Sequence, residues 1–228
     1  MLNDLPDTPL DIVGDVHGEL DALKALLAEA GYDAAGRHPE GRTLVFIGDL
    51  VDRGPNSPGV VGLVRELVEA GRALAILGNH ELNLLRGERK HGNDWFWNER
   101  RERDARFAPC TLLSSETERQ DLLGFFATLP LVLSRADLRV VHAAWHTSSV
   151  ELLSSLGSGH GPGEHFHRFG AEAEAQLETG GWLLRAEQER AHWNIHDAER
   201  EVPMLEAVAH CDELRQMANP IRVVTSGI

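Results

Sequence analysis

An apolar run that ends in a polar turn spans residues 43–54, Thr43-Leu44-Val45-Phe46-Ile47-Gly48-Asp49-Leu50-Val51-Asp52-Arg53-Gly54. The run over 43–47 carries no polar residue after Thr43, a pattern typical of a strand that is buried on both faces of a sheet. Apolar residues then recur at helical spacing from Val60 to Val68. We therefore predict a strand, a polar loop and a helix over this part of the chain.

The same unit occurs twice more. Leu10–Val13 is a short strand candidate, and leucines follow at helical spacing over 20–27, with Gly31 placed to end the helix. Residues 73–77 form a third apolar run, and a shorter helical pattern follows over 82–85. Three successive β-loop-α units predict an α/β fold in which helices flank a layered β-sheet core.

The second half of the chain is less regular. Residues 91–120 are charged and rich in aromatic side chains without a clean period, so we predict a cap-like insertion there. Further elements are predicted from local pattern: a helix over 117–128, a hairpin of strands 131–133 and 138–142, a flexible loop over 157–164, charged helical segments after it, and a final strand over Ile221–Thr225.

Composition bounds the class of protein. The 228 residues are 42% hydrophobic and 25% charged, which predicts a single folded domain over residues 1–228. The formal net charge of −14 excludes an extended basic surface for nucleic acid. We expect a cytoplasmic protein without a membrane span, because no run approaches roughly 18 apolar residues and residues 1–4 lack the basic start of a signal peptide. Cys110 and Cys211 show no spacing typical of a zinc knuckle or a disulfide framework.

Polar side chains follow directly after four of the apolar runs. In chain order they are Asp15, His17, Asp49, Asn79, His80 and His142. Ligands of open α/β sheets bind at the carboxyl ends of the strands, so we expect these side chains to share one site. Caps of helix N-termini are the alternative, but four strand ends that carry such residues together favour metal binding.

The mixture of carboxylate, imidazole and amide oxygen suits Mn²⁺, Fe²⁺, Co²⁺, Ni²⁺ or Zn²⁺ better than Ca²⁺. Two ions that share a carboxylate would use all of these ligands, and such pairs promote in-line displacement at phosphorus. The residues alone therefore point to phosphoester hydrolysis.

Three motifs carry a resemblance to a known family. Gly-Asp-x-His-Gly at 14–18, Gly-Asp-x-x-Asp-Arg-Gly at 48–54 and Gly-Asn-His-Glu at 78–81 resemble, in this order, the calcineurin-like metallophosphoesterase superfamily. The resemblance covers residues 10–145 and is to the branch with serine/threonine phosphoprotein phosphatases and symmetrical bis(5'-nucleosyl)-tetraphosphatases. The resemblance implies that the chain has the calcineurin-like metallophosphoesterase fold and is a hydrolase.

The resemblance also implies a ligand set for two divalent metal ions. Asp15 and His17 would hold the first ion, Asp49 would bridge, and Asn79 and His142 would hold the second. Manganese is the expected metal, with iron, nickel, cobalt or zinc as alternatives. A hydroxide shared by the two ions would be the nucleophile, so no covalent phosphoenzyme is required.

Three further residues take catalytic roles by the same resemblance. His80 would be the general acid that protonates the leaving oxygen, and Asp52 would orient its ring and favour its charged form. Arg53 would clamp the phosphoryl group with its planar guanidinium fork. Glu81 would pair with Arg53 and fix it.

The sequence departs from the family pattern near its end. Members usually supply a further metal-binding histidine after a late strand, whereas the strand predicted here ends in Thr225-Ser226-Gly227-Ile228. Three explanations stay open: the chain is truncated before the sheet is complete, one of His192, His196 and His210 substitutes, or water fills the position.

The predicted function is hydrolysis of phosphomonoesters or phosphoanhydrides by direct attack of metal-bound hydroxide. The substrate would be a phosphorylated small molecule, a dinucleoside polyphosphate or a phosphoprotein. A catalytically weak, metal-containing module that binds a phosphorylated ligand is the alternative, motivated by the missing histidine. Trp95, Phe96 and Trp97 would either stack on a nucleobase or cover an edge of the core.

Overall fold

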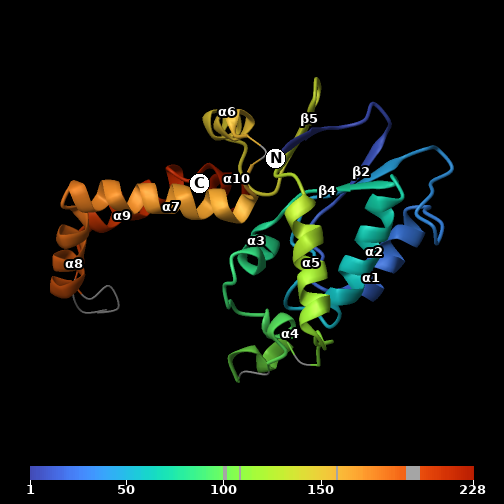
Figure 1. Cartoon of the computed structure of the whole chain (residues 1–228), viewed down its shortest axis with the longest axis horizontal. Coiled ribbons are helices and arrows are strands. Elements are labelled where there is room, and N and C mark those ends of the chain that lie inside the picture. The colour runs from blue at the N-terminus through green and yellow to red at the C-terminus, as the bar shows by residue number, and fades with distance from the viewer. Residues whose placement is uncertain (100–101, 108, 158, 194–200) are drawn as a thin grey trace.

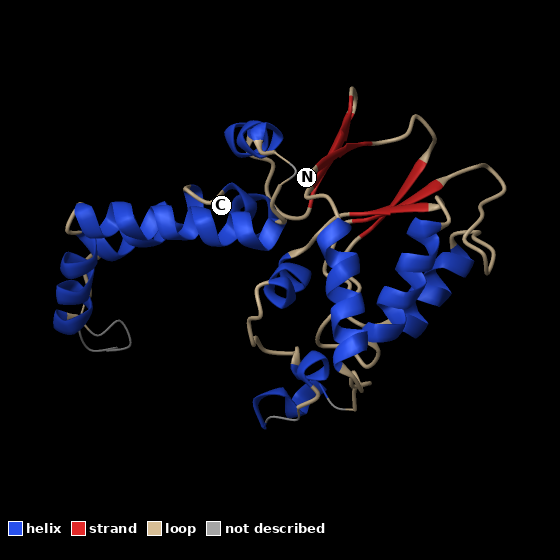
Figure 2. Cartoon of the chain, viewed as in Figure 1, coloured by secondary structure: helices blue, strands red, loops and turns tan. Residues whose placement is uncertain are grey.

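The computed structural model describes residues 1–99, 102–107, 109–157, 159–193 and 201–228. Its strands form two three-stranded sheets, with most helices on one side of them (Figure 2). The first sheet has the order β2-β3-β4 and is parallel throughout; it consists of β2 (Leu10–Val13), β3 (Thr43–Phe46) and β4 (Ala73–Ala75). In the second, β1 (Leu2–Asp4) runs parallel to β5 (Val132–Arg135), and β6 (Leu138–Val141) runs antiparallel to β5. The arrangement confirms the α/β prediction and the predicted hairpin, while β1 was not predicted.

The parallel register aligns the ends of the first sheet's strands. Phe46 of β3 pairs with Val13 of β2 on one side and with Ala75 of β4 on the other. Because the three strands run in one direction, the residues that follow them leave the sheet at the same edge. The predicted site residues of these three loops are therefore delivered to that edge.

The two sheets pack face to face. Side chains alternate along a strand, so Val45 of β3 points toward the second sheet while Leu44 and Phe46 point to the opposite face. The apolar residues between the sheets are Leu5, Val45, Ile76, Leu133 and Val140.

A larger core lies on the other face of the β2-β3-β4 sheet. The helices that cover this face are α1 (Leu20–Glu29), α2 (Ser57–Glu69), α3 (Asn79–Leu85) and α5 (Glu116–Thr128) (Figure 1). Helix α2 begins where the Asn56 side chain accepts the Gly59 N–H, with Pro58 in the first turn. The helices predicted after the three apolar runs and over 117–128 are thus confirmed.

The segment predicted as an insertion contains α4 (Asp94–Trp97) and the 3₁₀ helix η1 (Glu102–Phe107). Trp95 is 2% exposed and Phe96 is fully buried, and both belong to the main core. Of the two roles predicted for the aromatic cluster, the burial of these two rings favours the structural one.

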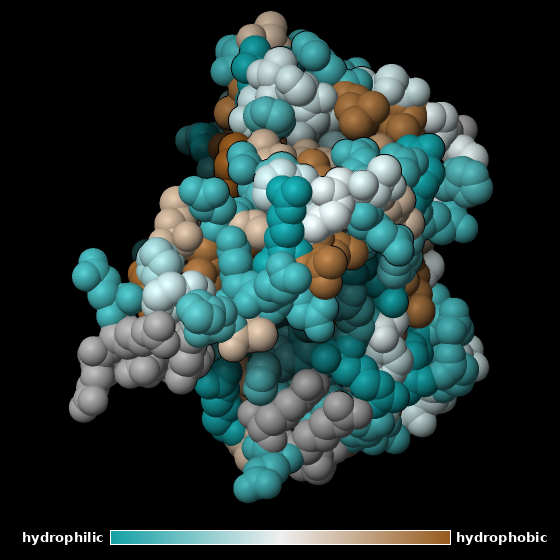
Figure 3. Space-filling model, turned by 90° about the vertical axis from the view of Figure 1, so that its left-hand side faces the viewer, coloured by the Kyte–Doolittle hydropathy of each residue, from teal (hydrophilic) through white to brown (hydrophobic). Residues whose placement is uncertain are grey.

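Five helices follow the hairpin in the described chain: α6 (Thr147–Ser155), α7 (Pro162–Thr179), α8 (Trp182–His192), α9 (Glu206–Met217) and α10 (Pro220–Ser226). Helices α7, α8 and α9 extend away from the sheets (Figure 1). The face of the molecule on that side is largely hydrophilic, with scattered apolar residues (Figure 3). Helix α7 begins at Pro162, inside the segment predicted to be a loop.

The predicted strand over Ile221–Thr225 is wrong, because these residues form helix α10. Pro220 lies in the first turn, where its fixed φ suits a helix, and the Asn219 side chain accepts the Arg222 N–H. A short apolar run fits a buried strand and a buried helix equally well by pattern alone. The Asn219 N-cap and the burial of the apolar side chains in the core favour the helix. These residues therefore supply no late strand.

No helix in the described part of the chain is both long enough and apolar enough to cross a membrane.

Candidate metal centre

The loops after β2 and β3 are joined by backbone hydrogen bonds. The N–H groups of Val16 and His17 both donate to the carbonyl oxygen of Asp49, at 3.0 and 2.9 Å. Ile47 donates in turn to Val13 at 3.0 Å. These bonds fix the two loops against each other and bring their polar side chains to one edge of the sheet.

Asp49 lies at the centre of the side chains gathered there. Its Oδ2 atom is 3.8 Å from His17 Nε2, and its Oδ1 atom is 3.5 Å from His142 Nε2. Asp15 Oδ2 is 3.7 Å from His17 Nε2 on one side, and Asn79 Oδ1 is 3.1 Å from His142 Nε2 on the other. The structure therefore brings all five predicted ligands together around Asp49.

The two predicted histidine ligands are oriented by backbone carbonyls. His17 Nδ1 is 2.9 Å from the Val51 oxygen, and His142 Nδ1 is 2.6 Å from the Ile47 oxygen. Such a bond keeps a proton on Nδ1, so the neutral ring can offer its Nε2 atom to a metal ion, which is the usual arrangement of metal-binding histidines. The donor set and its orientation therefore fit divalent metal ions.

Burial and neighbouring charges shift the pKa values of Asp49 and His142. Burial raises the pKa of Asp49, but the hydrogen bond and charge of His142 outweigh burial, so this pKa is lowered from its usual value. Burial alone would lower the pKa of His142, yet Asp49 and the Ile47 carbonyl raise it to about 9. Asp49 and His142 thus stabilise each other's charged form, as expected for oppositely charged groups held close together in a site.

His80 is held by Asp52. His80 Nδ1 is 2.6 Å from Asp52 Oδ2, and the Asp52 side chain is fully buried. Burial lowers the pKa of His80, but the Asp52 hydrogen bond and the charge of Asp49 overcome this, so the pKa is raised. A histidine held in this way is suited to donate a proton.

Arg53 contacts two of the site histidines, His17 and His80. One guanidinium nitrogen lies 2.9 Å from His17 Nε2 and another lies 3.0 Å from His80 Nε2. The predicted pairing of Glu81 with Arg53 is wrong, because the buried Glu81 carboxylate accepts backbone N–H groups of residues 49–51 and 78 instead. Glu81 therefore holds the loops of the site rather than the arginine.

Left-handed backbone is concentrated in the site. The residues other than glycine with positive φ include His17, Asp49, Asp52 and Arg53, at 46°, 50°, 73° and 67°. Such conformations are costly for these residue types and persist where surrounding contacts enforce them, commonly at functional sites. Hydrogen bonds to the Asp49 carbonyl, to the Glu81 carboxylate and to Gly92 in the cap segment (residues 91–120) hold these residues in that conformation.

The histidines considered as substitutes lie elsewhere or outside the described residues. His210 of α9 packs on the Trp182 ring, with ring centroids 4.1 Å apart, and His192 ends α8. Neither belongs to the two ligand groups found in the described chain. His196 falls outside the described residues.

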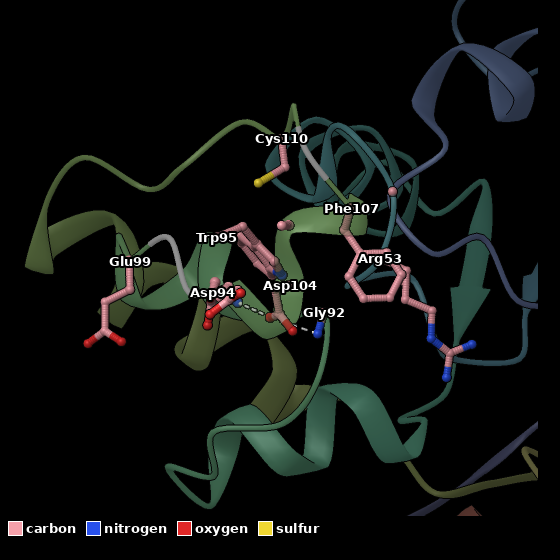
Figure 4. Close-up of a pocket in the computed structure, with 11 residues that line it drawn as sticks. Arg53, Gly92, Asp94, Trp95, Glu99, Asp104, Phe107 and Cys110 are labelled. Atoms are coloured by element: carbon pink, nitrogen blue, oxygen red, sulfur yellow. Dashed lines mark hydrogen bonds between the residues drawn. The ribbon is translucent and has the colours of Figure 1, made fainter.

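A cavity of about 280 Å³ lies beside Arg53 (Figure 4). Trp95 and Phe107 supply aromatic walls, and Asp94 and Asp104 lie near the backbone of Gly92. The Trp95 indole N–H also donates to Asp52 Oδ1 at 2.7 Å, a contact that the sequence analysis missed. The cap segment thus borders the site directly.

Comparison with known protein families identifies the family of this chain. The model of the calcineurin-like phosphoesterase family matches residues 8–201. The chain therefore belongs to the calcineurin-like phosphoesterase family, a class of hydrolases, as its motifs predicted.

Sequence relatives match over a shorter segment. The chain is 46% identical over 79 residues to the asymmetrical bis(5'-nucleosyl)-tetraphosphatase PrpE of Halalkalibacterium halodurans, covering 33% of this chain and 32% of that protein. It is 51% identical over 74 residues to the symmetrical bis(5'-nucleosyl)-tetraphosphatase of Pectobacterium carotovorum, covering 32% of this chain and 24% of that protein. The match thus spans a third or less of these relatives' length.

A solved structure shares the fold. A serine/threonine phosphatase from Saccharomyces cerevisiae with similarity to human phosphatase PP5 matches with a TM-score of 0.50 at 20% identity, covering 71% of this chain and 47% of that chain.

Proposed function

We propose that the chain is a dinuclear metal-dependent phosphoesterase. The observation that carries this proposal is the double membership of Asp49, which belongs to one group with His17 and His80 and to another with Asp15 and His142. Its two carboxylate oxygens lie toward different histidines, Oδ2 toward His17 and Oδ1 toward His142. This arrangement supports the proposal that one aspartate would contribute to two ions.

Asp15 and His17, whose Oδ2 and Nε2 atoms lie 3.7 Å apart, would hold one ion. Asn79 and His142, whose Oδ1 and Nε2 atoms lie 3.1 Å apart, would hold the other, and Asp49 would contribute to both. Asp15 also lies within reach of the His142 group, so the two ions would be close neighbours. Bound there, two divalent ions would supply an activated water and positive charge to offset the negative charge on the phosphoryl oxygens. Manganese is the first metal to test, because the ligands mix hard oxygen with imidazole nitrogen.

The remaining residues of the site would handle the proton and the phosphoryl group. His80, held at Nδ1 by Asp52, would donate a proton from Nε2 to the leaving oxygen. The Arg53 guanidinium, close to the Nε2 atoms of His17 and His80, would bind phosphoryl oxygens through its fork of N–H donors. Arg53 already contacts His80, so the two roles would act on the same phosphate.

For the substrate, we propose the phosphoanhydride of a dinucleoside polyphosphate, with phosphoproteins as the second candidate. The names of both sequence relatives support the first choice, over the third of the chain that they match. The cavity beside Arg53 offers room for a group attached to the phosphate. Phosphomonoesters of small molecules are a further candidate, because the same attack at phosphorus would hydrolyse them.

The test is a side-by-side assay with added Mn²⁺ on diadenosine tetraphosphate, a phosphoserine peptide and p-nitrophenyl phosphate. We expect turnover of at least one substrate, and Asp49→Asn should lower it about 100-fold or more, because the amide removes the negative charge and one of the two carboxylate oxygens that the ions would share. Asp7→Asn makes the same change of charge at an exposed position and should keep wild-type turnover. Equal turnover by Asp49→Asn would contradict the proposal, and metal binding without turnover of any substrate would favour a binding module.

A further inference from the structure

A chain of hydrogen bonds runs from the cap segment to the predicted general acid. The Trp95 indole N–H donates to Asp52 Oδ1 at 2.7 Å, and the other carboxylate oxygen, Oδ2, is 2.6 Å from His80 Nδ1. The Asp52 side chain is fully buried. Each carboxylate oxygen is therefore occupied by a ring nitrogen from a different part of the chain.

The indole is itself held in place. Trp95 is 2% exposed, and its ring packs edge-on against Phe96, with centroids 5.6 Å apart. A carboxylate can rotate about its last bond unless both oxygens are fixed, and a rotation of Asp52 would move its partner His80. The buried indole blocks that rotation because its donor is rigid.

A second contact ties the cap segment to the same turn. The Gly92 carbonyl accepts the Arg53 N–H at 3.1 Å, and the Gly92 N–H donates to Asp104 at 2.8 Å. Asp52 and Arg53 both have left-handed backbone, a conformation that needs support from outside the turn. The cap therefore supports the turn through its backbone and through the Trp95 side chain.

We propose that Trp95 is a positioning residue for proton transfer: its indole N–H fixes the Asp52 carboxylate, which fixes the ring of His80. The inference rests on the proposed function and adds a residue that lies outside the three motifs. Trp95 also lines the cavity beside Arg53 (Figure 4), so a test must separate loss of the N–H group from loss of the ring.

Two replacements at position 95 make that separation. Trp95→Phe removes the N–H and part of the ring, whereas Trp95→3-benzothienylalanine keeps the bicyclic shape and replaces the N–H by sulfur. Trp97→Phe is the matched control on the same helix, since Trp97 packs on Phe96 and its indole N–H has no hydrogen-bond partner within the described chain. A thermal melt of each variant shows whether it folds, and the benzothienylalanine variant keeps the core filled if Trp95→Phe does not.

The first readout is dependence on the leaving group. p-Nitrophenolate leaves without help from an acid, whereas phenolate needs the proton more. We expect both Trp95 variants to lower kcat for phenyl phosphate about tenfold or more, and kcat for p-nitrophenyl phosphate by no more than about threefold. Equal losses on the two substrates, or equal losses in Trp97→Phe, would overturn the inference.

The second readout needs no turnover. In the ¹⁵N-histidine-labelled 228-residue chain, the His80 Nδ1–H proton should resonate far downfield because of its short bond to Asp52. The His80→Asn variant identifies this resonance by its disappearance. We expect the resonance to move upfield in both Trp95 variants and to stay in place in Trp97→Phe. An unchanged resonance in the Trp95 variants would overturn the inference.

The two readouts distinguish failure of the inference from failure of the proposed function. A wild-type chain that turns over no phosphate substrate would contradict the proposed function, while the resonance would still decide whether Trp95 positions His80. If the wild type is active and the Trp95 variants lose equal activity on both aryl phosphates, the proposed function stands and the role of Trp95 in proton transfer is contradicted.

Discussion

Glu81 accepts the backbone N–H of Asp49 at 2.9 Å and so fixes the loop that carries the central aspartate of the site. Its carboxylate also accepts the N–H groups of Leu50 at 2.8 Å, Val51 at 3.3 Å and Gly78 at 3.0 Å. The side chain is fully buried, so these backbone donors have no access to water. One side chain of α3 therefore joins the loops after β3 and β4 and satisfies groups that would otherwise be costly to bury.

We expect Glu81→Gln to lower the free energy of unfolding by about 2–3 kcal/mol. The amide replaces one acceptor oxygen by an NH₂ group, which would face backbone N–H donors instead of accepting from them. Urea denaturation measures the loss. Glu66→Gln, at an exposed position of α2, is the control and should change stability by less than about 0.5 kcal/mol. A Glu81→Gln protein as stable as the wild type would show that four accepted bonds are not required.

Gly54 ends the Asp-Arg-Gly motif because there is no room for a side chain. A Cβ atom at this position would lie 2.0 Å from the His17 carbonyl oxygen and 2.8 Å from the Gly18 carbonyl carbon. We expect Gly54→Ala to destabilise the protein by about 2–3 kcal/mol, since backbone must move to accommodate the methyl group. Guanidinium chloride denaturation tests this.

Gly62→Ala is the matched control for Gly54→Ala. A Cβ at Gly62 would meet nothing within 4 Å, and the residue lies in the interior of α2. Alanine favours helix over glycine, so this change should stabilise the protein by about 0.5–1 kcal/mol. Equal effects of the two substitutions would contradict the steric explanation.

The fold was predictable where local pattern and burial agree. The runs over 43–47 and 73–77 are apolar because their strands are packed within the sheet, and the helices after them show the helical period because one face meets the core. The edge strand over 10–13 is less buried, with Ile12 49% exposed. The pattern failed at 221–225, where packing buries the apolar residues of a helix from several sides and no period appears. The three-residue strand β1 is too short to show any alternation.

The candidate site was predictable to the extent that its residues follow strand ends. Asp49 and the residues around it lie in motifs whose order along the chain matches the order in which the strands deliver them. The contact of Trp95 with Asp52 joins residues 43 positions apart through an aromatic side chain, and no spacing rule connects them. The role of Glu81 was misassigned because two opposite charges expected in one site suggest an ion pair, whereas the buried Glu81 carboxylate accepts backbone N–H groups.

Metal stoichiometry should separate the two ligand groups. After removal of metal with a chelator, titration calorimetry with Mn²⁺ should show two ions bound by the wild type and one by His142→Ala, because His142 belongs to only one group. Asp49→Ala should weaken both sites about tenfold or more, since it is shared. His167→Ala, at an exposed position of α7, should leave both sites unchanged. A single site in the wild type, or two intact sites in Asp49→Ala, would contradict the shared-aspartate arrangement.

Asp11 and Arg42 should give the protein an acid-sensitive contribution to stability. Arg42 Nε lies 2.7 Å from Asp11 Oδ2, and the Tyr32 hydroxyl donates to the same oxygen at 2.7 Å. The Arg42 hydrogen bond lowers the pKa of Asp11 from 3.8 to about 2. A carboxyl group with a lowered folded-state pKa stabilises the protein above its unfolded pKa, and this contribution disappears as the pH falls from about 4 to about 2. The pair is partly exposed, so we expect about 1 kcal/mol.

The measurement for Asp11 is the free energy of unfolding of wild type and Asp11→Asn as a function of pH. The wild type should be the more stable protein by about 1 kcal/mol near neutral pH, and the difference should shrink steadily below about pH 4, because protonation of Asp11 abolishes the charge that the variant lacks. Asp7→Asn changes the same net charge at an exposed position and should show no such narrowing. A difference between wild type and Asp11→Asn that is constant from pH 7 down to about 2 would mean that the charge on Asp11 contributes nothing and that only the hydrogen-bond geometry matters.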